Sequence, residues 1–559
     1  MSTSIALAMD LSAEFEIRAS RDDDVTKPTK TDLSLDDQAG LMAIGKKPVF
    51  ERKFNFWTAL CITACATGAW EGIGAAIFQA LKVGGPVALV WGYVICAVTM
   101  ICVAASLAEL ASIWPSSGAQ YHWTAELAPK RLRAELSWLV GWLAFTGAGS
   151  ATILCGMGVS MQIQAFAMIA NPDYAETAQR WHVYMIYLVI SAIYFSVNTF
   201  GVRLIHPLNA FGGFLHIFGY LVIIITLAIT TKDKHTAKYV FTDFSNNSGW
   251  PSSFVAFCVG MMTSMNGFPS IEIAAHFAEE IKHASRSLPR AMFWTVCLNA
   301  VFIFPWIILV LYCIGDLNEV LADPVALLSP LTIVFKNATG STAGSICLNS
   351  LGIYAGFMGG LDSLGSCARS IWAMSRDEAF PERFRRVHPK LQVPVWCIIA
   401  VSIPQTLIGI IYIWNTTAFY GVTSAALALL TISYSIPIGL FLFSGRRNPN
   451  IVLGEWNCGR LGYFINTVAF FWLIFISIFL CFPIYYPANV KSMNYASLII
   501  GSLSMVSLAT YFLYARGRFN GPVVEICLGM DPAEVGPTKE KATSTSKVAQ
   551  MAEKKADEK

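Results

Sequence analysis

A carboxylate stands among three glycines in the first long apolar stretch of the chain. Residues 65–78 read CATGAWEGIGAAIF and contain Gly68, Glu71, Gly72 and Gly74. Glycine inside a helix costs about 1 kcal/mol relative to alanine, and a charge at the centre of a membrane helix costs about 2.5–3.5 kcal/mol on insertion scales. The combination predicts an unwound helix that carries a binding site. The alternative for the glycines is close packing of helices through small residues.

The sixth apolar stretch is interrupted in a similar way. Residues 257–280 are broken in the middle by Asn266, Gly267 and Pro269, and Glu272 follows. Two broken spans, five apart, are typical of inverted-repeat carriers, which bind their substrate at the breaks near the middle of the membrane. Free N–H groups at the start of a half-helix then face anionic substrate groups, and exposed carbonyl groups face cations.

Glu272 is expected to act as a counter-charge for a substrate amine or as a proton carrier, because intramembrane carboxylates are functional by default. The alternative is a cap on the second half-helix. His276 lies one turn later on the same face; a Glu–His relay is one interpretation, and a satisfied structural histidine is the favoured one. An aromatic wall for an ammonium group is predicted from Trp70, Phe268 and Trp294. Packing or lipid contact is the stronger interpretation for any single aromatic, above all for Trp294.

The eighth apolar stretch has polar residues at helical spacing. Asp362, Ser366 and Arg369 recur at i, i+4 and i+7 and therefore share one face. Coupling of transport to an ion or proton, and a salt bridge between Asp362 and Arg369, are equally compatible with this spacing. The acidic loop residues that are expected to form gate or loop salt bridges are Glu279, Asp377 and Glu378.

The composition is that of a membrane protein. Of 559 residues, 55% are hydrophobic and 13% charged, against about 25% charged in soluble domains. The net charge of +3 is too small to indicate nucleic-acid binding. The 14 cysteines have no disulfide or zinc spacing, and the sequence has no metal, cofactor or enzyme motif. We therefore expect no enzyme, no metal and no cofactor.

About twelve apolar runs are long enough to span a membrane as helices. They lie near residues 54–80, 84–108, 136–162, 183–200, 207–230, 252–278, 291–314, 344–374, 394–413, 417–444, 461–482 and 495–515. With the N-terminus inside, inner loops hold fifteen Lys and Arg residues and outer loops seven, which agrees with the positive-inside rule. Glycosylation is predicted at the outer sequons of Asn246 and Asn337, whereas Asn415 is too near the membrane.

Three loop motifs carry a family resemblance. They are AELASIWPSSGAQYHWTAELAP (108–129), AAHFAEEIKHASRSLPRAM (274–292) and ARSIWAMSRDEAFPERFRRVHPKLQVPVW (368–396). Over residues 50–515 the chain resembles the amino acid–polyamine–organocation transporters, in particular their fungal amino acid/choline branch. The resemblance implies an all-α integral membrane protein with two inverted five-helix repeats, broken first and sixth helices, and two accessory helices. Glu71 departs from the branch, where an uncharged residue is expected, and Asp362 is also unusual.

The resemblance implies secondary active transport of amino acids, 4-aminobutyrate, choline or polyamines. We expect a proton-coupled importer of an amine-bearing molecule, either an amino acid or a choline-like compound, and the alternative class is a nutrient receptor with a carrier fold. The predicted organisation is a cytosolic tail (1–50), a transport core (51–445), two accessory helices (446–520) and a second cytosolic tail (521–559), in the plasma membrane. The residues expected to bind substrate are Gly68, Trp70, Glu71, Gly72, Gly74, Asn266, Gly267, Phe268 and Glu272, and those expected to couple transport are Glu272, His276 and Asp362.

Overall fold

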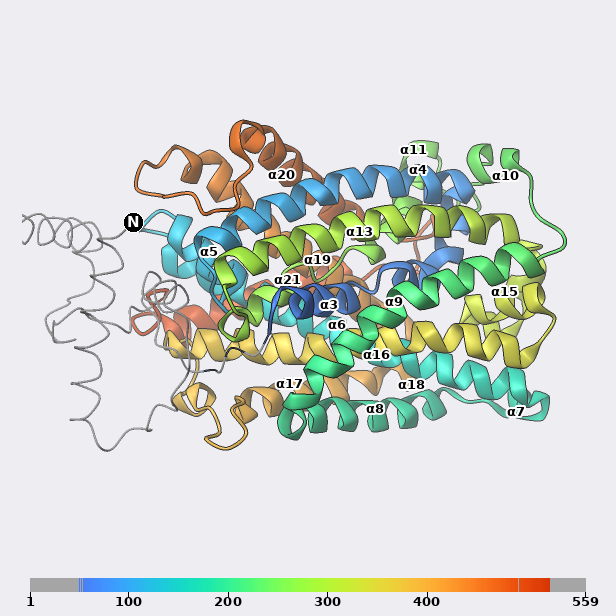
Figure 1. The fold of residues 1–559 in the computed structure, drawn as a ribbon, viewed down its shortest axis with the longest axis horizontal. Coiled ribbons are helices and arrows are strands. Elements are labelled where there is room, and N and C mark those ends of the chain that lie inside the picture. Colours follow the sequence, from blue (N-terminus) through green and yellow to red (C-terminus); the bar gives the residue numbers. More distant parts are fainter. Residues whose placement is uncertain (1–49, 51, 53, 491, 523–559) are drawn as a thin grey trace, which may run out of the picture. The chain divides into compact units, whose positions relative to one another are not determined.

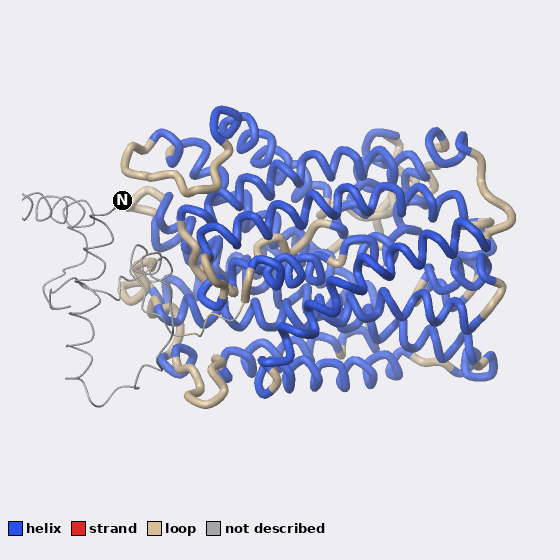
Figure 2. The backbone as a smooth tube through the Cα atoms, in the orientation of Figure 1, coloured by secondary structure: helices blue, strands red, loops and turns tan. Residues whose placement is uncertain are grey.

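Long helices side by side make up the part of the chain that the structure, a computed structural model, describes: residues 50–522 without 51, 53 and 491. No strand is present among these residues, and non-helical segments lie inside the bundle as well as at its ends (Figures 1 and 2). The all-helical fold expected from the sequence is therefore confirmed. The two predicted tails fall outside the described residues, except for their innermost positions.

The helices follow one another with short connections. They are α3 (Phe56–Thr67), α4 (Ala69–Ile113), α5 (Ala119–Leu127), α6 (Arg133–Ala170), α7 (Pro172–Thr177), α8 (Arg180–Phe200), α9 (Val202–Thr230), α10 (Ala237–Thr242), α11 (Ser253–Met261), η1 (Met262–Gly267), α12 (Ile273–His276), η2 (Ala278–Glu280), α13 (Ala284–Cys313), α14 (Leu317–Ala322), η3 (Pro324–Leu327), α15 (Pro330–Thr339), α16 (Thr342–Arg376), η4 (Glu382–Arg385), α17 (Val395–Gly409), α18 (Ile411–Trp414), α19 (Thr416–Phe443), η5 (Gly445–Arg447), η6 (Gly459–Leu461), α20 (Gly462–Phe479), α21 (Ala496–Thr510) and η7 (Tyr511–Ala515).

Among the described residues, nine helical stretches are long and apolar enough to cross a membrane. One of them, Phe56–Ile113, has 58 residues, which is about 87 Å of helix and far more than a hydrocarbon core of about 30 Å. It leaves helical geometry at Gly68 and at Gly85, so it contains the first two predicted spans. The sixth predicted span is divided among α11, η1, α12 and η2, and the eighth is α16, whose many Gly and Ser residues lower its hydropathy. All twelve predicted runs thus correspond to helices.

Polar side chains fix where several spans begin. The Asn55 side chain accepts a hydrogen bond from the Thr58 N–H at 3.0 Å and starts α3. The Ser341 hydroxyl accepts from the Gly344 N–H at 3.2 Å and starts α16. Such caps satisfy backbone donors that have no acceptor within the helix and are worth about 1 kcal/mol each. They define the ends of the helices that hold the polar interior.

The short helix α3 lies in the interior, in contact with α9, α13 and α16. The other large contacts join α4 to α13 and α6 to both α16 and α19. At the periphery, hydrophobic side chains are exposed, such as Ile229 at 77% and Phe211 at 51%. Exposed apolar side chains along helices of this length are what lipid contact requires, since lipid tails are themselves apolar.

The connecting helices gather at the two ends of the bundle. In Figure 1, α5 lies at the left end, whereas α7, α10 and α15 lie at the right end. The glycosylation sites expected at the outer end differ in their surroundings. Asn337 is exposed on α15, but the Asn246 side-chain amide donates to the Trp250 carbonyl at 2.8 Å. Asn415 caps α19 by accepting from the Ala418 N–H at 3.0 Å. Glycosylation stays a prediction, and Asn337 is the more accessible acceptor.

The orientation can be tested with two single cysteines. In a Cys347→Ser background, Asn337→Cys on α15 should react with a membrane-impermeant maleimide in intact cells that display the protein at their surface. Arg385→Cys on η4 should react only after permeabilisation, because the Lys and Arg bias places that loop inside. Reaction of the Arg385→Cys variant alone in intact cells would reverse the orientation.

Candidate functional site

The first helix break is centred on Gly68. Its backbone is left-handed (φ 51°, ψ 52°), and it ends α3 and begins α4. Glycine adopts this conformation without the penalty that a side chain would bring. The Gly72 N–H closes the first turn of α4 onto the Gly68 carbonyl at 2.6 Å, so the N–H groups of Ala69, Trp70 and Glu71 have no acceptor within the helix. The break thus leaves free backbone donors at the start of the second half-helix.

The two breaks touch each other. A β-carbon at Gly72 would lie 2.5 Å from the Asn266 carbonyl oxygen, so only glycine permits this approach of α4 to η1. Asn299 of α13 joins the same two segments, because its side-chain amide donates to Thr67 Oγ1 at 2.9 Å and to the Gly267 carbonyl at 3.4 Å. The sequence analysis missed Asn299, although an amide inside an apolar span is itself a signal.

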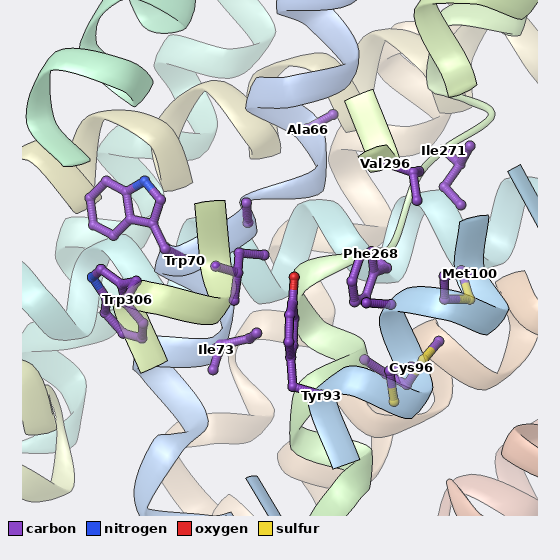
Figure 3. Close-up of a cluster of buried hydrophobic side chains, with 14 of the residues drawn as sticks. Ala66, Trp70, Ile73, Tyr93, Cys96, Met100, Phe268, Ile271, Val296 and Trp306 are labelled. Atoms are coloured by element: carbon purple, nitrogen blue, oxygen red, sulfur yellow. The ribbon is translucent and has the colours of Figure 1, made fainter. Parts of the chain in front are cut away.

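Aromatic rings line the region between the breaks (Figure 3). Trp70 and Trp306 lie together, with ring centroids 6.2 Å apart, and Phe268 stacks on Tyr93 at 5.6 Å. All four are buried. Trp294, by contrast, is 49% exposed on α13. Trp294 therefore does not lie among these rings: it faces outward, as its alternative interpretation expected, whereas Trp306 lies against Trp70.

Glu71 forms a buried pair with a residue that the sequence analysis did not single out. The His216 Nδ1 atom lies 3.1 Å from Glu71 Oε1, and the two side chains are 8% and 7% exposed. The second oxygen of Glu71 is buried without a hydrogen-bond partner, as are the indole N–H groups of Trp70 and Trp306. Buried polar groups are normally satisfied, and these three are among the described side-chain atoms that lack a partner. His216 could have been singled out from the sequence, because an ionisable residue inside a predicted membrane span is by default a candidate functional residue.

Gly74 serves packing. A β-carbon there would lie 2.4 Å from Leu331 of α15 and 3.0 Å from the Trp306 ring. The part of α4 around Gly74 is thereby covered by α15, which also contacts α16. The surroundings of Gly74 match the alternative interpretation, close packing of helices through small residues. A role of Gly74 in ligand binding stays a prediction.

Glu272 and His276 are bonded to different segments. Both are buried. Glu272 accepts a hydrogen bond from the Tyr434 hydroxyl of α19, whereas His276 Nδ1 lies 3.0 Å from the Ser117 carbonyl oxygen. Because a carbonyl only accepts, Nδ1 of His276 carries a hydrogen. This arrangement matches the structural interpretation of His276. Tyr434, nine residues before the end of α19, was not foreseen.

Asp362 is hydrogen-bonded to a neighbouring helix and not to a residue of its own helix. Its Oδ1 accepts from the Asn209 amide of α9 at 3.0 Å, and its Oδ2 is buried without a partner. Arg369 instead forms an ion pair with Glu280 at 2.6 Å, between side chains that are 5% and 9% exposed. The predicted salt bridge between Asp362 and Arg369 is therefore not the arrangement adopted, because nearer partners on α9 and η2 engage each residue.

A second buried ion pair lies beside the first. Arg376 Nη1 contacts both carboxylate oxygens of Glu279 at 2.9 Å, and both side chains are 4% exposed. Together with the pair of Arg369 and Glu280, it joins the C-terminal end of α16 to η2 of the broken span. We call these four residues the inner ion-pair cluster. The prediction that Glu279 takes part in a gate salt bridge agrees with this pairing.

The loop helix α5 closes over the same end. The Tyr121 hydroxyl donates to Asp377 Oδ2 at 2.5 Å. Burial and the neighbouring Asp377 carboxylate raise the pKa of Tyr121 well above its usual value, so the phenol stays protonated and remains a donor. Glu378 is exposed, with a φ of 64°. Asp377 thus contributes a hydrogen bond, and Glu378 lies outside the cluster.

Known proteins resemble this chain over most of its length. Residues 54–503 match the family model described as amino acid permease. The choline transporter of Saccharomyces cerevisiae is 27% identical over 87% of this chain and 85% of its own length. A Macrophomina phaseolina protein, provisionally named as an amino acid/polyamine transporter, is 31% identical over 77% of this chain and 94% of its own. Amino-acid permease 2 of Neurospora crassa is 26% identical over 89% and 91%.

The inner ion-pair cluster makes a testable contribution to stability. Arg376→Ala leaves the Glu279 carboxylate buried without its counter-ion and should lower the free energy of unfolding by about 3–5 kcal/mol. Arg386→Ala, the control, removes a pair with Glu382 in which the side chains are 68% and 73% exposed, and should cost at most about 1 kcal/mol. Denaturant unfolding of the purified protein in detergent measures both. Equal small losses would show that the buried pair does not hold this end together.

Proposed function

This chain belongs to the amino acid permease family, and from that premise we propose that it is a proton-coupled importer of an amine-bearing molecule. The family and the named relatives are permeases and transporters, so the chain is a membrane transporter of amino acids or related compounds and not an enzyme. The proposal beyond this concerns the charged group that is recognised and the ion that drives uptake.

The observation that carries the proposal is the unpaired oxygen of Glu71. It lies one turn after the break at Gly68. Its partner His216 lies against the Trp70 ring, which in turn lies against Trp306. A carboxylate in a dry, aromatic environment attracts a positive charge strongly, because the low dielectric strengthens the interaction. An ammonium group would supply the hydrogen bond that Oε2 lacks. A quaternary ammonium has no N–H to donate and would rely on the negative faces of the indole rings.

The opposite end of an amino acid also fits the break. The N–H groups at the start of α4 lack acceptors within the helix, and the positive end of the helix dipole favours an anion there. An amino acid would thus place its carboxylate at Ala69–Glu71 and its amine toward Glu71 Oε2. A choline-like molecule has no carboxylate and would use only the part of this site that receives the amine. The site therefore favours amines generally, and the choice between the two classes depends on whether a carboxylate is required.

Coupling is assigned to buried carboxylates away from the rings. Asp362 lies near the C-terminal end of α3, because a β-carbon at Gly359, one turn earlier on α16, would lie 3.3 Å from the Cys65 carbonyl. The negative end of the α3 dipole beside a carboxylate favours a bound proton or cation. Glu272, bonded to Tyr434, is the second candidate, and His276 would act only through a rearrangement that frees it from Ser117.

The proposed cycle opens one end of the bundle at a time. The inner ion-pair cluster and the contact of Tyr121 with Asp377 hold the cytosolic end closed, so substrate release requires these bonds to separate. At the other end, α15 covers the outer part of the first span. We further propose that the protein acts at the plasma membrane with both termini in the cytosol. A nutrient receptor with the same fold would bind the amine without accumulating it.

Replacing Glu71 tests the amine site. Glu71→Gln keeps the size of the side chain but removes its charge, and should weaken cationic substrates more than neutral amino acids, by about 1–3 kcal/mol for a lost charged hydrogen bond. The loss should be smaller for a quaternary amine. Competition of choline, 4-aminobutyrate, spermidine and alanine for uptake measures the difference, with Glu382→Gln on the exposed loop as the control. An equal loss for every compound would mean that Glu71 only supports the helix break.

Replacing the coupling carboxylates tests the driving ion. Glu272→Gln should abolish accumulation driven by a pH gradient and keep exchange of internal for external substrate, since glutamine cannot take up and release a proton. Asp362→Asn is measured in the same way, in vesicles with an imposed pH gradient. Wild-type accumulation in both variants would remove both carboxylates from the coupling mechanism.

A further inference from the structure

His216 is placed where it controls the charge of the proposed amine site. It comes from α9, and its Nδ1 lies 3.1 Å from Glu71 Oε1. The ring also lies against Trp70, with centroids 6.2 Å apart and planes inclined by 27°. One carboxylate, one imidazole and one indole thus meet at the first turn of α4. When Glu71 is ionised, its oxygen only accepts, so the neutral imidazole carries its hydrogen on Nδ1.

From this geometry we propose that His216 is a built-in competitor of the substrate's amine for Glu71. The inference rests on the proposed amine site and goes beyond it by naming the residue that sets its affinity. With a neutral imidazole, the pair carries one negative charge and attracts an ammonium group. When a proton binds Nε2, the imidazolium neutralises Glu71, and an incoming ammonium meets a second positive charge. Binding of the amine and protonation of His216 therefore oppose each other.

Among the described residues packed around Glu71, His216 is the group that can neutralise it. α13 contributes the Trp306 ring, and α15 contributes Leu331, with Lys336 more than one turn farther along. On α16, Arg369 is engaged with Glu280. The titratable groups that face this part of α9 are Cys61 and Cys65 of α3 and Tyr354 and Asp362 of α16. None of these four becomes a cation when it binds a proton, so they cannot replace the imidazolium.

The linkage has a fixed sign. By reciprocity, a proton that weakens amine binding is itself released when the amine binds. If the substrate's ammonium group and the proton on His216 exclude each other completely, the apparent KM rises as the pH falls below the range in which His216 titrates. The rise is at most about tenfold for each pH unit. The released proton leaves Nε2 for water on the side to which the site is open. Acid then has two separate effects, since it supplies the coupling proton and also weakens amine binding.

The test uses choline, whose charge does not change with pH, and 4-aminobutyrate for comparison. The KM and the maximal rate of uptake are measured at external pH from about 5 to 8, where imidazoles titrate, at fixed internal pH and membrane potential. In wild-type protein the KM for choline should rise toward acid. His216→Gln, which keeps a donor for Glu71 but cannot be charged, should make the KM independent of pH. His206→Gln is the matched control, because this half-buried histidine of the same helix lies against Phe54 and not Glu71.

The outcomes separate the inference from the proposed function. If Glu71→Gln weakens choline but His216→Gln keeps the wild-type dependence of KM on pH, the inference is wrong and the amine site stands. If Glu71→Gln changes no amine, or neither compound binds at any pH, the amine site itself is wrong and the inference falls with it. His216→Asn is measured in parallel with His216→Gln. If one of these two variants no longer reaches the cell surface, the other is used for the comparison.

Discussion

Backbone groups that leave a helix inside a membrane must find partners within the protein, because lipid offers none. The centre of this molecule is organised by that requirement. The breaks at Gly68 and after Gly267 leave carbonyl and N–H groups free, and Asn299 supplies an amide to the segments on both sides. The close approach of Gly72 to Asn266 brings these groups to one place. A cluster of polar groups inside an apolar bundle follows from the breaks themselves.

The buried charges depend on the same arrangement. Five of them are bonded to a segment other than their own: Glu71 to α9, Glu272 to α19, Asp362 to α9, and the two arginines of α16 to η2. A buried charge without its partner is costly, so these bonds hold the broken segments in defined positions. They are also the bonds that must exchange when the protein changes conformation. In the proposed cycle, binding of a ligand at the breaks and movement of the gates are therefore energetically linked.

Much of the fold could be predicted because hydropathy and glycine act locally. Twelve apolar runs became helices, and the breaks at Gly68 and Asn266–Pro269 lie where the sequence interrupts its own periodicity. The partners of the polar residues could not be predicted in the same way. The i, i+7 spacing placed Asp362 and Arg369 on one face, but residues of other helices, Asn209 and Glu280, engage them. The same limit applies to His216 and Tyr434, since choosing a partner requires knowing which helices are neighbours.

The central claim is that the free oxygen of Glu71 receives the substrate's amine. The most direct measurement is a structure determined by electron cryo-microscopy with an accumulated amine bound. We expect the nitrogen within about 3 Å of Glu71 Oε2 for a primary amine, or within about 6 Å of the Trp70 ring for a quaternary one. An amine bound beside Glu272 and Tyr434, with the pair of Glu71 and His216 undisturbed, would contradict the claim.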